Sequence, residues 1–134
     1  SSDQRADAVK KALIQSTVAA NSVAFSPDSK RIITASSDKA AYIWQASNGQ
    51  RLAELCGHTR SVNSAAYSPD GKFIVTASDD GTARVWDANN GRSLNVLYGH
   101  IGRVYSAVFS PAGKYIATAS ADGTARIWKH PASH

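Results

Sequence analysis

The chain has 134 residues, of which 43% are hydrophobic, and a formal net charge of +5 at pH 7. It has no apolar run long enough to span a membrane as a helix, and its one cysteine, Cys56, excludes a disulfide framework within the chain. The basic residues are scattered singly or in pairs, which favours solvated surface over a nucleic-acid-binding stripe. We therefore expect a globular protein with no membrane partner, and nucleic acid is a disfavoured partner.

The N-terminal segment is predicted to be a polar lead followed by one strand. Residues 1–7 lack the basic-then-apolar pattern of a secretion signal. Together with the lone cysteine, this favours a cytoplasmic protein, and the nucleus fits equally well. Residues 8–14 predict a strand, because Ala8–Leu13 aligns with the strand-like segment Gln50–Leu55.

From residue 15 onward the sequence repeats with a period of 42 residues. Trp44, Trp86 and Trp128 keep this spacing, and 19 of 30 positions are identical between 57–86 and 99–128. A fixed period of this size indicates a repeat architecture. The repeats are predicted over 15–56, 57–98 and 99–129, with no room for a last strand in the third, and residues 130–134 are predicted to be a tail.

The second repeat predicts four short strands joined by tight turns. Pro69-Asp70-Gly71 and Asp80-Gly81 are turn signals, and Asn90-Gly91 is a third. Since a lone four-stranded meander cannot bury both of its faces, neighbouring repeats must stack. The predicted strands are Ser61–Ser68, Phe73–Ser78, Thr82–Trp86 and Ser93–Tyr98.

The pairs Gly57-His58 and Trp86-Asp87 resemble the signature of WD-repeat (Trp-Asp repeat) β-propellers, at the repeat length of that family. The resemblance covers the chain from about Ala8 to Trp128. It implies an all-β fold with three WD repeats per chain, each a propeller blade made of a four-stranded antiparallel meander. It also implies a noncatalytic scaffold for protein interaction, with no cofactor and no metal.

In that family a His, a Ser, an Asp and a Trp form a buried hydrogen-bonded tetrad in each blade. The first repeat departs from the pattern because Gln15-Ser16 replaces Gly-His, and because Lys39 stands where later repeats have a turn glycine. By position, the implied structural tetrads are His58, Ser78, Asp80 and Trp86 in the second repeat, His100, Ser120, Asp122 and Trp128 in the third, and Ser36, Asp38 and Trp44 in the first.

Three patterns invite a chemical interpretation. The Ser, His and Asp of a tetrad could form a hydrolase triad, but we expect them to be buried structural groups because they recur with a tryptophan. His130 and His134 have a metal-ligand spacing, but Pro131 and the chain end favour a frayed tail. Cys56 could be a reactive thiol, and a small buried core residue is the favoured interpretation.

In WD-repeat propellers, partners bind at the face that bears the Gly-His loops. Residues that vary between repeats at that face are the better candidates, because repetition is explained by folding. Arginine and tyrosine are also enriched at binding hot spots. The candidate partner-binding residues for an unidentified protein or peptide are Arg60, Asn63, Asp79, Arg103 and Tyr105.

Three blades fall short of the 4–8 that usually close a propeller. The sequence therefore predicts association with other copies of itself, with a dimer of six blades favoured over a trimer of nine. Two alternatives remain open: the sequence is a piece of a longer repeat array, or it is a purely structural self-assembling or designed building block.

Overall fold

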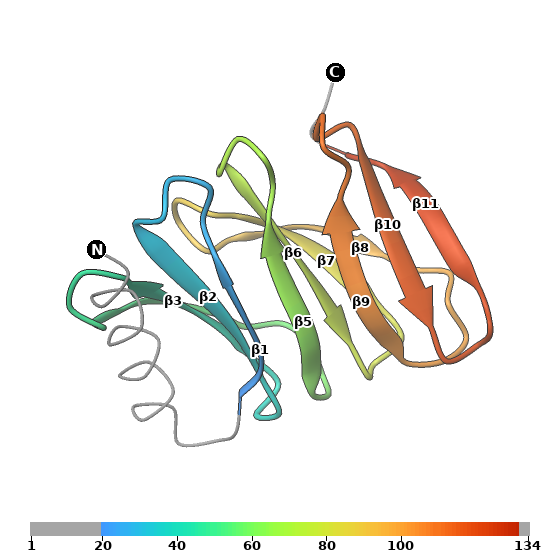
Figure 1. Cartoon of the computed structure of the whole chain (residues 1–134). Helices are drawn as coiled ribbons and strands as arrows, with labels where there is room; N and C mark the ends of the chain where they lie inside the picture. The colour runs from blue at the N-terminus through green and yellow to red at the C-terminus, as the bar shows by residue number, and fades with distance from the viewer. Residues whose placement is uncertain (1–19, 132–134) are drawn as a thin grey trace.

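The computed structural model describes residues 20–131, and in this range the chain forms three antiparallel β-sheets that lie side by side like the leaves of a fan (Figure 1). The all-β prediction is confirmed for these residues. We refer to the three sheets as the first, second and third blades. The polar lead over 1–7, the strand predicted over 8–14 and the Gln15-Ser16 pair lie outside the described residues.

Within each blade the strands follow one another in chain order, as a meander. The first blade contains β1 (Ala20–Phe25), β2 (Arg31–Ser36), β3 (Ala41–Gln45) and β4 (Arg51–Leu55). The second contains β5 (Val62–Tyr67), β6 (Phe73–Ser78), β7 (Ala83–Asp87) and β8 (Ser93–Leu97). The third contains β9 (Val104–Phe109), β10 (Tyr115–Ser120) and β11 (Ala125–Lys129).

The turn between the second and third strands of each blade requires a positive φ at one position. Gly81 and Gly123 have φ of 87° and 85°, and Lys39 adopts φ of 81° at the equivalent place in the first blade. A residue with a Cβ is strained in this region, whereas glycine is not. The expectation that Lys39 occupies a glycine position is therefore correct.

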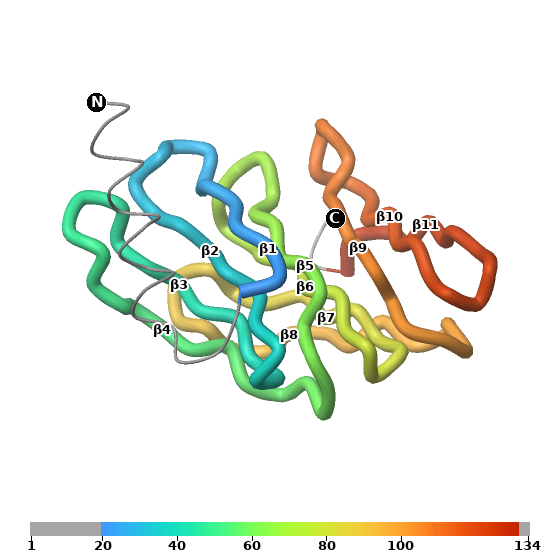
Figure 2. The backbone as a smooth tube through the Cα atoms, turned by 60° about the horizontal axis from the view of Figure 1, so that its bottom comes forward, coloured from blue at the N-terminus to red at the C-terminus, as the bar shows by residue number. Residues whose placement is uncertain are grey.

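Two of the three buried hydrophobic clusters lie between blades, and the third, which includes Ile32 and Trp44, consists of first-blade residues alone. Ile33, Ile43 and Leu55 of the first blade pack against Val62 and Ile74 of the second, and all five are buried. The second blade packs against the third in the same way, through equivalent residues that include Val75, Val85, Val104 and Ile116. The inner strands β1, β5 and β9 lie next to one another, as both views show (Figures 1 and 2).

The C-terminal segment corrects one expectation. His130 was expected to lie in a frayed tail, but it is buried, and its ring contacts Phe73 at 4.6 Å and Phe109 at 5.1 Å between centroids. Its backbone amide donates to the Lys114 carbonyl at 2.8 Å. The two aromatic rings supply apolar surface that outweighs the effect of Pro131, whereas His134 lies outside the described residues. Within 20–131, no helix is long and apolar enough to span a membrane.

Candidate functional site

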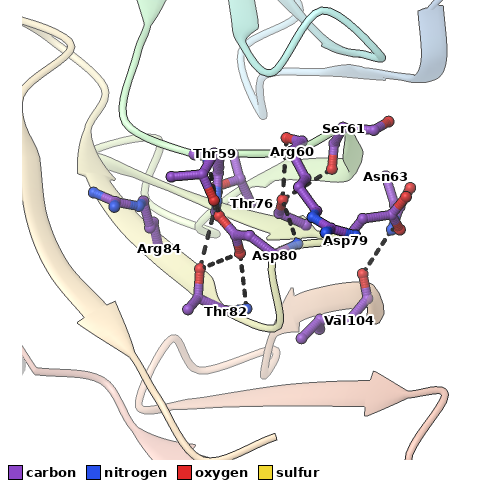
Figure 3. A network of polar contacts seen from close by, with 12 residues as sticks. Thr59, Arg60, Ser61, Asn63, Thr76, Asp79, Asp80, Thr82, Arg84 and Val104 are labelled. Carbon is purple, nitrogen blue, oxygen red and sulfur yellow. Dashed lines mark hydrogen bonds and ion pairs between the residues drawn. The ribbon is translucent and has the colours of Figure 1, made fainter. Parts of the chain in front are cut away.

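A chain of buried hydrogen bonds ties the second blade together at the end that bears the Gly-His loop. Trp86 Nε1 donates to Thr76 Oγ1 at 2.8 Å, and Thr76 Oγ1 lies 2.6 Å from His58 Nε2. His58 Nδ1 lies 2.8 Å from Asp80 Oδ2. Asp80 also accepts hydrogen bonds from the backbone amide of Thr59 and from the amide and hydroxyl of Thr82, and Figure 3 shows this carboxylate among its partners.

The protonation states in this network follow from its surroundings. Burial lowers the pKa of His58, against the opposing influence of Asp80, so the imidazole is neutral near pH 7. The pKa of Asp80 is also lowered: burial acts to raise it, but the hydrogen bonds from Thr82 and His58 outweigh that effect. Because a carboxylate only accepts, Nδ1 of His58 carries the proton and Nε2 accepts from Thr76. Each donor in the chain thus has an acceptor.

The assignment of Ser78 to the tetrad was wrong, because Thr76 occupies the position between His58 and Trp86. Successive side chains of a strand point to opposite faces, so Thr76 and Ser78 on β6 share one face, but Ser78 lies beyond the reach of the indole. Its Oγ instead donates to the Ser61 carbonyl at 2.9 Å and accepts from the Asp80 amide at 3.1 Å.

The third blade has the same network in a more exposed setting. His100 Nδ1 lies 2.8 Å from Asp122 Oδ2, and Thr118 Oγ1 accepts from Trp128 Nε1 at 2.9 Å and lies 2.7 Å from His100 Nε2. Here too the serine assignment was wrong, since Ser120 Oγ donates to the Arg103 carbonyl at 2.8 Å.

In the first blade a tyrosine takes over the contact that the histidine makes elsewhere. Trp44 Nε1 donates to Thr34 Oγ1 at 2.9 Å, and the hydroxyl of Tyr42 donates to the carboxylate of Asp38. Ser36 is again displaced from the tetrad, and its Oγ accepts from the Asp38 amide at 3.2 Å. Tyr42 was not among the residues predicted for the tetrad of the first repeat. The available signal was a difference between repeats: Tyr42 occupies the position that is arginine in the other two repeats, at Arg84 and Arg126.

The geometry gives no support to a hydrolase triad. A serine nucleophile must contact its histidine base, but the hydroxyl of Ser78 is directed at backbone carbonyls. His58 is bonded to Thr76 instead, whose hydroxyl is buried and also accepts from the indole of Trp86. These residues have a structural role, because their hydrogen bonds link the strands of the blade.

Two of the candidate partner-binding residues are engaged within the fold. Asn63 Nδ2 donates to Asp79 Oδ1 at 2.7 Å and to the Val104 carbonyl of the next blade at 2.9 Å. Asn21 makes the corresponding bond, at 2.8 Å, to the carbonyl of Val62. An asparagine at this position thus joins each of the first two blades to its successor.

The remaining candidates are exposed at this end of the molecule. Arg60 and Arg103 lie in the loops that precede β5 and β9, and Tyr105 lies on β9 at the position of Asn63. Because no further blade follows the third one in the described residues, the ring of Tyr105 is more than half exposed. These three side chains remain candidates for partner contact.

The expectation that Cys56 is a buried core residue was wrong. Its side chain is exposed, because it follows the end of β4 and precedes Gly57 in the connecting loop. Partial burial and the neighbouring carboxylate of Glu54 raise the pKa of its thiol. A raised pKa reduces the thiolate fraction, so Cys56 is not an activated nucleophile. Among the residues of 20–131 there is also no group of three potential metal ligands.

Comparison with known proteins agrees with this geometry. The family model described as "WD domain, G-beta repeat" matches the chain three times, over residues 11–45, 49–87 and 91–129. No curated protein matches the sequence. WD40 repeats generally serve as noncatalytic modules of protein interaction. Each match ends with the third strand of a blade, and the second and third matches begin with the last strand of the preceding blade, β4 or β8. Since the three matches cover most of the chain, the protein belongs to the WD40 family.

Proposed function

We propose that this chain is a noncatalytic protein-interaction scaffold that completes a propeller ring by association of its copies, with two chains giving six blades. The support comes from the outer flank of the third blade, which we define as the exposed face of β9–β11 that carries Val108, Ala119, Ala125 and Ile127. This third-blade flank repeats the residues that form the core between blades within the chain.

One set of aligned residues shows how bare this flank is. Ile127 is 71% exposed, whereas its equivalents Ile43 and Val85 are 1% and 0% exposed because the next blade covers them. Exposed apolar surface of this kind is a docking surface or an aggregation hazard. A further blade would cover it, and a second copy supplies one of matching shape.

A ring requires head-to-tail contact. The third-blade flank of one copy then meets the face of the other copy's first blade that is turned away from its second blade. On that side Val23 and Phe25 are exposed. Val23 aligns with Ala65 and Ala107, which pack against the preceding blade. Ile32, Tyr42 and Trp44 on the same side are buried, so a second copy would meet this side mainly through Val23 and Phe25.

The test is the absolute mass in solution, measured by light scattering after gel filtration. A closed pair has twice the chain mass of 14.2 kDa. We expect Ile127→Glu and Val23→Glu each to give a monomer, because both surfaces take part in a head-to-tail ring. Leu94→Glu is the control, since Leu94 is exposed on the outer strand β8, away from both flanks.

Each outcome discriminates. At tens of micromolar, a Kd near 1 μM would put roughly nine-tenths of the chains in the dimer. A monodisperse monomer of the unchanged protein at this concentration therefore contradicts ring completion. A dimer that Ile127→Glu dissociates and Val23→Glu does not would show instead that two third-blade flanks pair with each other. That second arrangement is an isologous contact, in which the same surface of both copies meets, rather than the head-to-tail contact of a ring.

A further inference from the structure

Several hollows lined by residues of 20–131 lie at the end of the blades opposite the Gly-His loops. Two of them, with volumes of about 300 and 430 Å³, adjoin at the seam between the first and second blades and share Arg31. The first is bounded by the turns β1–β2 and β5–β6, with Tyr67 in its wall. The second reaches Ala88, beyond β7. Figure 1 places the turns that bound the first hollow together at the top of the fan.

The seam between the second and third blades provides an internal comparison. Arg31, Tyr67 and Ala88 of the first seam correspond, 42 residues later, to Phe73, Phe109 and His130. In the second seam the three rings pack edge to face, and the hollow that remains there is smaller, at about 220 Å³.

The first seam is built differently. Ala88 contributes only a methyl group where the second seam has the imidazole of His130, and a guanidinium replaces the ring of Phe73. At this end of the second seam the contact between blades is made by aromatic rings, so the polar groups of Arg31 and Tyr67 are not needed for contact at the same end of the first seam.

Both polar groups of the first seam are hydrogen-bond donors. The hydroxyl oxygen of Tyr67 is buried and has no hydrogen-bond partner among the described residues. Burial raises the pKa of Tyr67 to about 12, so the hydroxyl keeps its proton near neutral pH. The guanidinium of Arg31 and the carboxylate of Asp28 both lie close enough to act on the charge of Tyr67, in opposite directions. The hydrogen bond from Arg31 to the Ala88 carbonyl is long, at 3.5 Å. An unpaired buried hydroxyl is rare in native proteins and calls for an explanation.

We propose that this hollow binds a carboxylate, presented by an Asp or Glu side chain of a partner peptide. A carboxylate offers two oxygens as acceptors, one for the guanidinium of Arg31 and one for the hydroxyl of Tyr67. The rim carries the carboxylates of Asp28 and Asp70 as well as the ammonium of Lys30. Two rim carboxylates repel a dianion more than a monoanion, so a carboxylate fits this hollow better than a phosphate group does.

The hollow lies within one chain and does not depend on the association of copies. The inference rests on the proposed scaffold function only in identifying the carboxylate as part of a protein partner. The two proposals also fail separately, because ring completion is decided by mass in solution and carboxylate binding by a titration.

The experiment is an NMR titration of the full-length chain with short capped peptides. The probe is acetyl-Gly-Glu-Gly-amide, and acetyl-Gly-Gln-Gly-amide is its uncharged match. Acetyl-Gly-Gly-Gly with a free C-terminus tests whether the hollow prefers the carboxylate of a chain end. Inorganic phosphate tests whether it prefers a phosphate group. We expect saturable shifts at Arg31 and Tyr67 with the glutamate peptide, and none with the glutamine peptide.

The variants use residues that the chain itself has at equivalent positions. Tyr67→Phe restores the ring found at Phe25 and Phe109, and it should weaken binding about tenfold, as expected for the loss of a hydrogen bond to a charged group. Arg31→Phe, which copies Phe73, should abolish saturable binding. Tyr115→Phe is the control, because it removes an exposed phenol from the third blade and should leave the affinity unchanged.

The proposal is overturned if the glutamate peptide causes no shift at about 10 mM, well above the Kd of even a weak site. It is equally overturned if Tyr67→Phe binds as tightly as the unchanged protein. Tighter binding of phosphate would contradict the carboxylate assignment, and tighter binding of the peptide with the free C-terminus would contradict a side-chain source.

Discussion

Replacing Thr76 with valine tests the hydrogen-bond network of the second blade. Valine keeps the shape of threonine but has no hydroxyl, so the buried Trp86 Nε1–H and His58 Nε2 each lose a partner. Each unpaired buried group costs about 1–3 kcal/mol, and we expect a loss of about 3 kcal/mol in the free energy of unfolding. The measurement is urea denaturation followed by tryptophan fluorescence, with linear extrapolation at a fixed protein concentration, because association would also change apparent stability.

Ser78→Ala is the matched comparison, because the two interpretations of the tetrad rank it differently. Its hydroxyl donates to the Ser61 carbonyl, which also accepts from the Asp79 amide at 3.0 Å and therefore stays paired without it. The Asp80 amide loses its partner and the Arg60 carbonyl loses a longer contact at 3.2 Å, so the expected cost is about 1 kcal/mol. If Ser78→Ala destabilises the protein more than Thr76→Val does, then the hydrogen-bond chain that we describe is incorrect.

Three further predictions concern stability. Lys39→Gly should raise the melting temperature, because glycine adopts the positive φ at this turn without strain, which is worth about 1 kcal/mol. Gly81→Lys should lower it for the same reason, and a lower melting temperature of Lys39→Gly would contradict this reasoning. Burial lowers the pKa of His130, so the unfolded chain binds more protons than the folded one as pH falls below about 6.5, and stability should fall with acidification. His130→Ala should flatten that pH dependence in denaturation series between about pH 7 and 5, and an unchanged slope would exclude a contribution from this group. Asn63→Ala should lower the free energy of unfolding by about 1–2 kcal/mol, because the Val104 carbonyl loses this hydrogen bond between blades. A decrease of less than about 0.3 kcal/mol in urea denaturation would refute this role for Asn63.

The repeat, the strands and most of the turns were predictable because their signals are local. Phe73–Ser78 matched β6 residue for residue, since a β-branched and aromatic run between turn residues has few other stable conformations. The positive φ at Lys39 followed from its alignment with glycines at the same turn. The period of 42 also implied stacked blades, which the buried residues between the sheets confirm.

The errors arose where a contact depends on how side chains meet across strands. Thr76 and Ser78 are two residues apart on one strand and share a face, so spacing alone did not distinguish which hydroxyl reaches Trp86. Cys56 was expected to be buried because cysteine usually is, but the chain leaves β4 immediately before it. The burial of His130 depends on the rings of Phe73 and Phe109, which come from two different blades.

The amino-acid sequence by itself determined that this protein is a stack of WD-repeat meanders, because period, turn residues and β-propensity act over a few residues at a time. The tertiary structure alone decided which polar groups pair, which flank is bare and where a hollow forms. The same aligned position is core in one blade and surface in another: Ile43 is covered by the second blade, whereas Ile127 has no blade beyond it in the described residues. Burial is a property of neighbours, and neighbours are set by packing between elements that are far apart in the chain.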